Sequence, residues 1–192
     1  MFLVGDQINP TTGEKTLGNR SHSGQLVSFV DYVNADGKGS TMLNGEENSM
    51  IRLVKLPIPD NNDLNRLWDP DFPAMRLTEV YYMLAECKWR AGEGAAAAQL
   101  INTVRKRNFT NGIDPDPVPD NFDKYRLADE WMIEFLGEGR RRTDLIRLGL
   151  FTTENWWTHK ATNDDTKKRF PIPTIDIQAN PLLEQNPGYD GK

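Results

Sequence analysis

Two adjacent runs of helical periodicity constrain the fold of this chain more than any other feature of its sequence. In the first run, apolar side chains recur at helical intervals, at Leu77, Val80, Tyr81, Leu84, Cys87 and Ala91. Gly92 and Gly94 interrupt the pattern, and a second run follows with Ala97, Leu100, Ile101 and Val104 on one face. Apolar residues at this spacing form one face of an α-helix. The sequence therefore predicts two antiparallel helices joined by a short turn over residues 74–107.

The predicted hairpin has the length of one tetratricopeptide unit, which is about 34 residues. A single hairpin cannot bury both of its faces, so it needs neighbouring helices in this chain or in a longer parent chain. A third helix is expected over residues 123–136, where Leu127, Trp131 and Phe135 share one side, and a short fourth helix over residues 144–150. Trp131 and Trp89 lie within helical patterns, and we expect both in the core.

The remaining segments have no sustained period and read as loops. Residues 1–73 form a loop-rich segment with one short element at 26–33 and a short strand at 50–58, which prolines end. The C-terminal tail reads as extended, anchored on the helices by Ile172, Ile175, Leu182, Leu183 and Tyr189. The predicted fold is one region, 1–192, of the all-α class: a tetratricopeptide-like helical hairpin (74–107) plus further helices and tail (121–192), with extensive irregular loops.

Composition excludes several classes of function. The chain carries 28 acidic and 23 basic residues, a formal charge of −5, which disfavours nucleic acid as a partner. It contains no run of about 20 apolar residues that could span a membrane. Cys87 is the only cysteine, so neither an internal disulfide nor a thiolate zinc site can form, and we expect a buried, unreactive thiol. The first residues lack the pattern of a secretory signal.

Five sequence pieces occur in a characteristic order. They are RLTEVYYMLAE at 76–86, INTVRKR at 101–107, Glu134 with EG at 138–139 followed by Arg141 and DLIR at 144–147, PIP at 171–173, and NPLLEQNPGY at 180–189. Together they resemble the C-terminal part of the SusD/RagB family of outer-membrane nutrient-binding lipoproteins of Bacteroidetes. Trp131 beside Glu130, and Leu148 before Gly149, depart from residues common in the family. The resemblance covers about residues 50–189.

The resemblance implies a surface-exposed lipoprotein of the outer membrane that binds a glycan or another nutrient. Its partner would be a TonB-dependent transporter of the SusC kind, which it would cover as a lid. No catalysis and no cofactor are implied. Family members are usually far longer and carry an acylated cysteine near the start, and Cys87 lies mid-helix. We therefore expect this chain to be a C-terminal fragment or a short relative.

Charged residues at helical spacing predict a structural network, formed by Arg76, Glu79, Glu134, Glu138, Arg141 and Asp144. Glu134 and Glu138 also suggest an alternative, because glycoside hydrolases use a pair of carboxylates across a substrate cleft. The neighbouring arginines should keep these carboxylates ionised and paired, whereas an acid catalyst needs a raised pKa. We therefore favour the structural role and predict no catalytic residue.

Aromatic side chains in loops are the candidates for ligand binding, because a flat ring can stack on the CH face of a sugar. The predicted ligand-binding residues are Trp68, Trp156, Trp157, Asn19 and Arg20, and for each tryptophan packing remains the alternative. His22 and His159 lack partners at ligand spacing, so no metal site is predicted. Two readings of function remain beside nutrient binding: a protein-interaction module without a small ligand, and the hydrolase.

Overall fold

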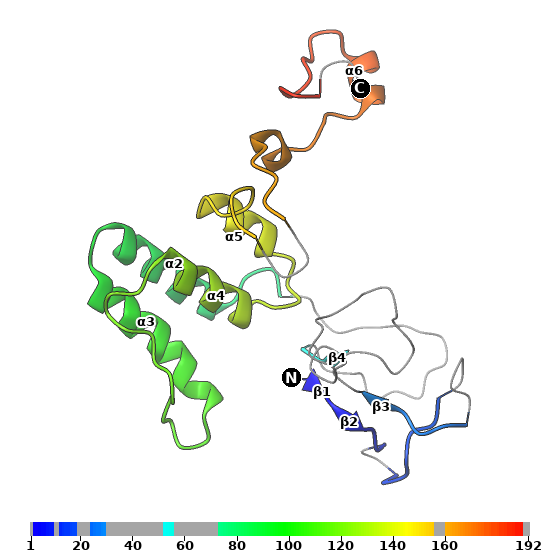
Figure 1. The fold of residues 1–192 in the computed structure, drawn as a ribbon, viewed down its shortest axis with the longest axis vertical. Helices are drawn as coiled ribbons and strands as arrows, with labels where there is room; N and C mark the ends of the chain where they lie inside the picture. The colour runs from blue at the N-terminus through cyan, green and yellow to red at the C-terminus, as the bar shows by residue number, and fades with distance from the viewer. Residues whose placement is uncertain are drawn as a thin grey trace. The chain divides into compact units, whose positions relative to one another are not determined.

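The computed structural model describes residues 2–9, 12–18, 24–29, 52–55, 73–155 and 160–189 (Figure 1). The chain divides into two compact units, residues 1–74 and residues 75–192. Helices dominate the described residues, and the strands are short, so the prediction of an all-α fold is confirmed. Within the described ranges, we find no helix with the length and apolar character needed to span a bilayer.

The N-terminal unit contains two pairs of very short antiparallel strands. β1 (Phe2–Leu3) pairs with β4 (Arg52–Leu53), and β2 (Gly5–Asp6) pairs with β3 (Ser28–Phe29). β4 lies inside the range 50–58 in which the sequence predicts a strand, and β3 lies inside 26–33. Val27 is the only buried hydrophobic residue among those described in this unit. Its described part therefore gains order from backbone pairing more than from a core.

The predicted hairpin is present as α2 (Leu77–Arg90) and α3 (Gly94–Arg105), followed by the 3₁₀ turn η2 (Lys106–Asn108). Gly92 adopts a φ of +80° between the helices, a conformation that glycine tolerates better than other residues. Gly94 has a steric role, because a Cβ at this position would lie 2.1 Å from the carbonyl oxygen of Asp120. The tetratricopeptide assignment of the hairpin stays a prediction.

The buried face of α2 differs from the one that its apolar pattern predicts. Its buried residues are Thr78, Glu79, Tyr82, Ala85 and Glu86. In contrast, Leu77 and Leu84 are 72% and 47% exposed, and Cys87 is exposed, so the predictions of a buried apolar face and a buried thiol are wrong. The physical reason is that arginines from outside α2 pair with Glu79 and Glu86. These ion pairs offset the free-energy cost of burying the two carboxylates.

Helix α4 (Lys124–Glu134) packs the largest side chain of the core against the hairpin. Its start is capped by Asp123, whose side chain accepts hydrogen bonds from the backbone N–H groups of Tyr125 and Arg126. Trp131, predicted for the core, is 1% exposed and meets Tyr82 of α2 edge to face, with ring centroids 5.3 Å apart. Trp89 is partly buried, packs against this core and donates from Nε1 to the carbonyl oxygen of Phe122.

The C-terminal segment contains more helix than predicted. After α5 (Arg141–Arg147) it forms the 3₁₀ turn η3 (Asp165–Lys168) and α6 (Thr174–Ala179). The predicted anchors Ile175 and Leu182 are 73% and 88% exposed, so their anchoring role is wrong. Gln185 orders the tail instead, because its side chain accepts from the Ile172 N–H and donates to the Ile172 carbonyl. Hydrogen bonds of this kind produce no apolar periodicity, so the sequence pattern does not predict them.

Mutations on the buried face and on the exposed face of α2 should change the free energy of unfolding by different amounts. Tyr82→Ala removes a buried ring from the core and should lower the free energy of unfolding by about 3 kcal/mol or more. Leu84→Ala removes a half-exposed side chain and should change it by about 0.5 kcal/mol. Urea unfolding of both variants measures the difference. A larger loss for Leu84→Ala than for Tyr82→Ala would contradict this assignment of the buried face.

Candidate functional site

The residues predicted to bind a ligand lie outside the described residues. They are Trp68, Trp156, Trp157, Asn19 and Arg20. Their roles therefore stay predictions. The six residues of the predicted charge network all lie in the described part of the chain, where their contacts can be followed.

Arg76 joins the start of α2 to the end of α4. Its guanidinium donates to Glu134 Oε1 from Nη1 at 3.0 Å and to Glu138 Oε1 from Nη2 at 2.8 Å. Arg107 donates to the same carboxylate of Glu134 from Nη2, and to Thr78 Oγ1 from Nη1 at 2.7 Å. Both glutamates are thus held by cations that come from other elements, which ties the hairpin to α4.

A second group of ion pairs joins α2 to α5. Glu79 pairs with Arg140, whose Nη2 also lies 3.6 Å from Asp144 Oδ1. Arg147 Nη1 pairs with the same oxygen of Asp144 at 2.8 Å, and Arg147 Nη2 with Glu86 Oε2 at 2.9 Å. The structure thus joins Glu79 to Arg140 and Asp144.

Arg141 makes contacts of a different kind from the rest of the predicted network. Its Nη1 donates to the carbonyl oxygen of Ala128 at 2.5 Å, and its Nη2 lies 3.8 Å from Asp129 Oδ1. Both partners belong to α4, so Arg141 links the start of α5 to that helix.

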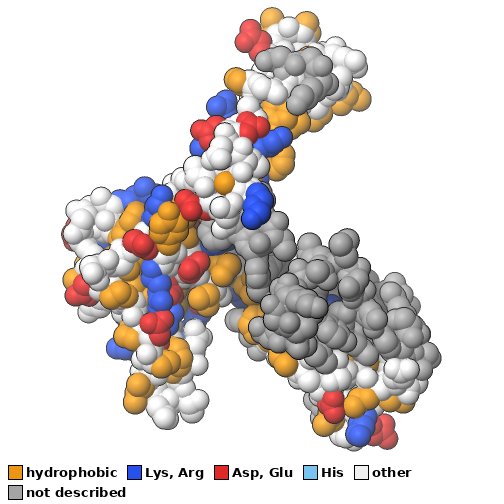
Figure 2. Space-filling model, viewed as in Figure 1, with side chains coloured by type: hydrophobic (Ala, Val, Ile, Leu, Met, Phe, Trp, Pro, Cys, Tyr) orange, Lys and Arg blue, Asp and Glu red, His pale blue; other side chains and the backbone are white. Residues whose placement is uncertain are grey.

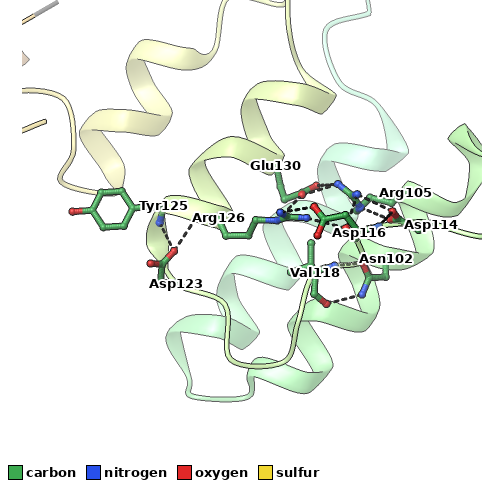
Figure 3. A network of polar contacts seen from close by, with 9 residues as sticks. All are labelled: Asn102, Arg105, Asp114, Asp116, Val118, Asp123, Tyr125, Arg126 and Glu130. Carbon is green, nitrogen blue, oxygen red and sulfur yellow. Dashed lines mark hydrogen bonds and ion pairs between the residues drawn. The ribbon is translucent and has the colours of Figure 1, made fainter. Parts of the chain in front are cut away.

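A third network fastens the proline-containing loop of residues 114–120 to the helices (Figure 3). Arg105 lies between two carboxylates, with Nη1 2.7 Å from Glu130 Oε1 and Nε 2.5 Å from Asp114 Oδ2. Arg126 Nε lies 3.0 Å from the same oxygen of Glu130. The hydrogen bond from Arg105 lowers the pKa of Asp114. The buried carboxylate of Glu130 is thus paired with two guanidinium groups, one from α3 and one from α4.

Sequence reasoning missed most partners in these networks. Arg105, Arg107, Arg140 and Arg147 supply the cations, and Glu86 and Glu130 supply further carboxylates. One signal was available: Glu79 and Glu86 are seven residues apart, and Glu130 and Glu134 four apart, so each pair shares one face of its helix. Chemically, carboxylates surrounded by guanidinium groups are suited to joining helices in the packed unit, whereas an acid catalyst needs a carboxyl group that holds its proton at neutral pH.

A cavity of about 300 Å³ lies between α5 and the C-terminal segment. We call it the Phe170 cavity. It is lined by the aromatic residues Phe151, Phe170 and Tyr189, by the cations Arg142, Lys167 and Arg169, and by Thr162. The Phe170 side chain is an exposed large hydrophobic group, at 69%. Figure 2 shows other hydrophobic side chains at the surface, among charges of both signs. An aromatic ring beside cations and a hydroxyl is chemically suited to a polar ring-shaped ligand.

Hydrogen bonds from side chains to backbone carbonyls, and contacts between Arg142 and two aromatic rings, hold the walls of the Phe170 cavity in place. Asn186 Nδ2 donates to the carbonyl oxygen of Phe170 at 2.8 Å, and the Tyr189 hydroxyl donates to that of Arg169 at 3.1 Å. The Arg142 guanidinium lies over two rings, 5.0 Å from the Phe151 centroid and 4.3 Å from the Phe170 centroid. The backbone on either side of Phe170 is thus held by hydrogen bonds, and the Arg142 guanidinium contacts its exposed ring.

The described residues contain no cluster of three or more His, Cys, Asp or Glu side chains that could hold a metal ion. His22 and His159 lie outside the described ranges.

Comparisons with known proteins agree on one family. A model described as the SusD family matches residues 10–189. The starch-binding protein SusD of Bacteroides thetaiotaomicron is 39% identical over 129 residues, which are 63% of this chain and 22% of that protein. The SusD-like protein P25 of Formosa agariphila is 34% identical over 126 residues, which are 59% of this chain and 24% of that protein. The chain thus aligns with less than a quarter of the length of each relative.

The double pairing of Glu134 predicts a large effect of its neutralisation. Glu134→Gln should lower the free energy of unfolding by about 2 kcal/mol, because it leaves the partly buried guanidinium group of Arg76 and the exposed one of Arg107 without their shared anion. The matched control is Glu93→Gln, which disrupts an exposed pair with Lys88 and should cost less than about 0.5 kcal/mol. Equal losses in urea unfolding would contradict a structural role of Glu134.

The lowered pKa of Glu86 predicts that the stability of the protein changes at acid pH. Burial alone would raise its pKa, but hydrogen bonds from Arg147 and Arg90 outweigh burial and lower the pKa below the usual 4.5. A carboxylate with a depressed pKa contributes stability above the unfolded value, and this contribution is lost as pH falls through the folded value. The stability difference between the wild type and Glu86→Gln should therefore be largest at neutral pH and shrink below pH 4.5.

Chemical unfolding at several pH values between 7 and 3 measures this difference, with Glu93→Gln as the control for loss of an exposed carboxylate. A difference between the wild type and Glu86→Gln that stays constant over this range would contradict the assignment.

Proposed function

The chain belongs to the SusD family, and from this membership we propose that it binds a saccharide nutrient at the bacterial cell surface for uptake into the cell. The match of the family model to residues 10–189 is the observation that carries the proposal. A relative named for starch binding supports a saccharide as the nutrient. Because the chain spans less than a quarter of the relatives' length, the activity proposed is that of the whole protein.

The Phe170 cavity is the part of the described structure that suits this function best. A sugar offers a face of CH groups to a flat ring and hydroxyl groups to polar side chains around that ring. Phe170 supplies an exposed ring, and the Thr162 hydroxyl is a polar neighbour in the same cavity. Trp68 and Trp156 remain further candidates for stacking on the sequence argument alone.

We place the protein in the outer membrane as a surface-exposed lipoprotein, with a SusC-like TonB-dependent transporter as its partner. A second candidate function, protein interaction through the hairpin without a small ligand, is favoured by one observation. The exposed face of α2 carries large apolar side chains at Leu77, Val80, Met83 and Leu84, and such a face suits contact with another protein surface.

We propose binding without catalysis. The carboxylates of Glu134 and Glu138, which suggested a hydrolase, both accept hydrogen bonds from Arg76. Paired in this way, they are poorly suited to donate a proton to a glycosidic oxygen. Glycan cleavage by the protein, lost in Glu134→Gln, would overturn this part of the proposal.

Calorimetric titration with oligosaccharides tests the proposed function. Maltoheptaose serves as the neutral probe and oligogalacturonate as the acidic probe. We expect saturable binding of at least one probe, weakened about tenfold by Phe170→Ala because the stacking ring is lost. The sequence hypothesis predicts a similar loss for Trp156→Ala and Trp68→Ala.

The matched control is Tyr125→Ala, which removes an exposed aromatic ring of α4 that does not line the cavity. It should leave affinity unchanged. Flat titrations with both probes would reject saccharide binding. Flat titrations together with co-purification of the transporter would favour the second candidate function.

A further inference from the structure

The cations of the Phe170 cavity lack the partners that arginines have elsewhere in the helical unit. Arg76, Arg105 and Arg147 each pair with two carboxylates. In the part of the chain that the structure describes, neither Lys167 nor Arg169 forms an ion pair, and no Asp or Glu lines the cavity. Lys167 and Arg169 thus lie at the cavity without a described ion pair, although Arg169 interacts electrostatically with Asp165, in a protein whose formal charge is −5.

Arg142 is part of the same charge excess. Its Nη2 donates to the carbonyl oxygen of Lys167 at 2.8 Å, a neutral acceptor, and among the described residues Arg142 forms no ion pair with a carboxylate. The aromatic contacts with Phe151 and Phe170 hold its guanidinium at the cavity wall. A guanidinium has five N–H donors, so this arginine keeps donors free for a ligand after its bond to the carbonyl.

The carboxylates that are close in sequence are engaged with other partners. Asp165 pairs with Lys168 Nζ at 2.6 Å and accepts from Thr152 Oγ1 at 3.1 Å. Asp164 accepts from the N–H and the hydroxyl of Thr166. The hydrogen bond from Lys168 lowers the pKa of Asp165, and the charge of Arg169 acts in the same direction. Counted formally, Arg142, Lys167, Lys168 and Arg169 carry four positive charges against the two negative charges of Asp164 and Asp165.

The charges around the cavity indicate the chemical class of its ligand. Building on the proposed function, we infer that the Phe170 cavity binds an anionic sugar unit, whose carboxylate or sulfate group meets Arg142, Lys167 and Arg169 while its ring stacks on Phe170. Arginine forms paired hydrogen bonds to such oxygen anions, and lysine adds a point charge. The neutral surface of the ring and the anionic substituent are recognised by different side chains of one cavity.

The size of the cavity agrees with a short stretch of a polymer. Ligand cavities typically range from about 300 to 1,000 Å³, and a volume of about 300 Å³ lies at the lower end. It accommodates one or two sugar units rather than a long chain. The rest of an acidic polysaccharide would continue along the surface, so the cavity selects for charge on a unit within the chain.

Comparison of three oligosaccharides tests the inference on the purified protein. The probes are neutral maltoheptaose, oligogalacturonate with carboxylates, and a sulfated galacto-oligosaccharide, titrated by calorimetry at 50 and 500 mM NaCl. We expect one acidic probe to bind about tenfold more tightly than the neutral probe at low salt. This preference should shrink at high salt because the charges are near the surface. The better acidic probe identifies the group as carboxylate or sulfate.

Variants separate charge recognition from stacking. Arg169→Ala should weaken the acidic probe about tenfold and the neutral probe far less, while Arg169→Lys should retain most of the affinity for the acidic probe. Phe170→Ala should weaken both classes. The matched control is Lys106→Ala, which removes an exposed cation of η2 outside the cavity and should have no effect.

The outcomes distinguish this inference from the function on which it rests. Equal affinity for neutral and acidic probes, or acidic binding indifferent to Arg169→Ala, would overturn the anionic ligand and leave saccharide binding intact. Failure of all three probes to bind would overturn both. Tight acidic binding that depends on Arg169 and on Phe170 supports both.

Discussion

Two buried carboxylates on α4, Glu130 and Glu134, are the constraint on which the helical unit depends. They lie one turn apart on either side of Trp131, the largest fully buried side chain of the core. A carboxylate without a cation would be far too costly to bury there. Arg105 at the end of α3 meets Glu130, while Arg76 and Arg107 meet Glu134. Helix α4 can therefore bury Trp131 against the hairpin only when the arginines of the hairpin are in register with its acids.

Pairing between arginines and carboxylates also connects the core to the Phe170 cavity. Arg140 and Arg147 pair with Glu79 and Glu86 of α2, which fixes α5 to the hairpin. Arg142, on the first turn of that helix, then holds the rings of Phe151 and Phe170 by its guanidinium. A chain of charged contacts thus links the core to the aromatic wall at which we place the ligand.

The distribution of paired and unpaired cations separates structural from functional charge. Arginines in the helical networks neutralise buried carboxylates, which suits packing and argues against acid catalysis. The cations of the Phe170 cavity lie beside an exposed ring and form no ion pair with a described carboxylate. That contrast, more than the number of charges, supports our proposals that this region binds a ligand and that the ligand is an anionic saccharide.

The sequence by itself determined the presence of helices α2 to α5, the turn at Gly92 and the family, because periodicity, glycine punctuation and ordered motifs are local properties, whereas it gave no sign of α6. It also placed Trp131 in the core. Only the tertiary structure decided which face of α2 is buried, because the partners of Glu79 and Glu86 lie about 60 residues away and their pairing outweighs the apolar pattern. For the same reason the Phe170 cavity was invisible in the sequence: its walls come from α5, the following turn and the tail, which meet only in the folded chain.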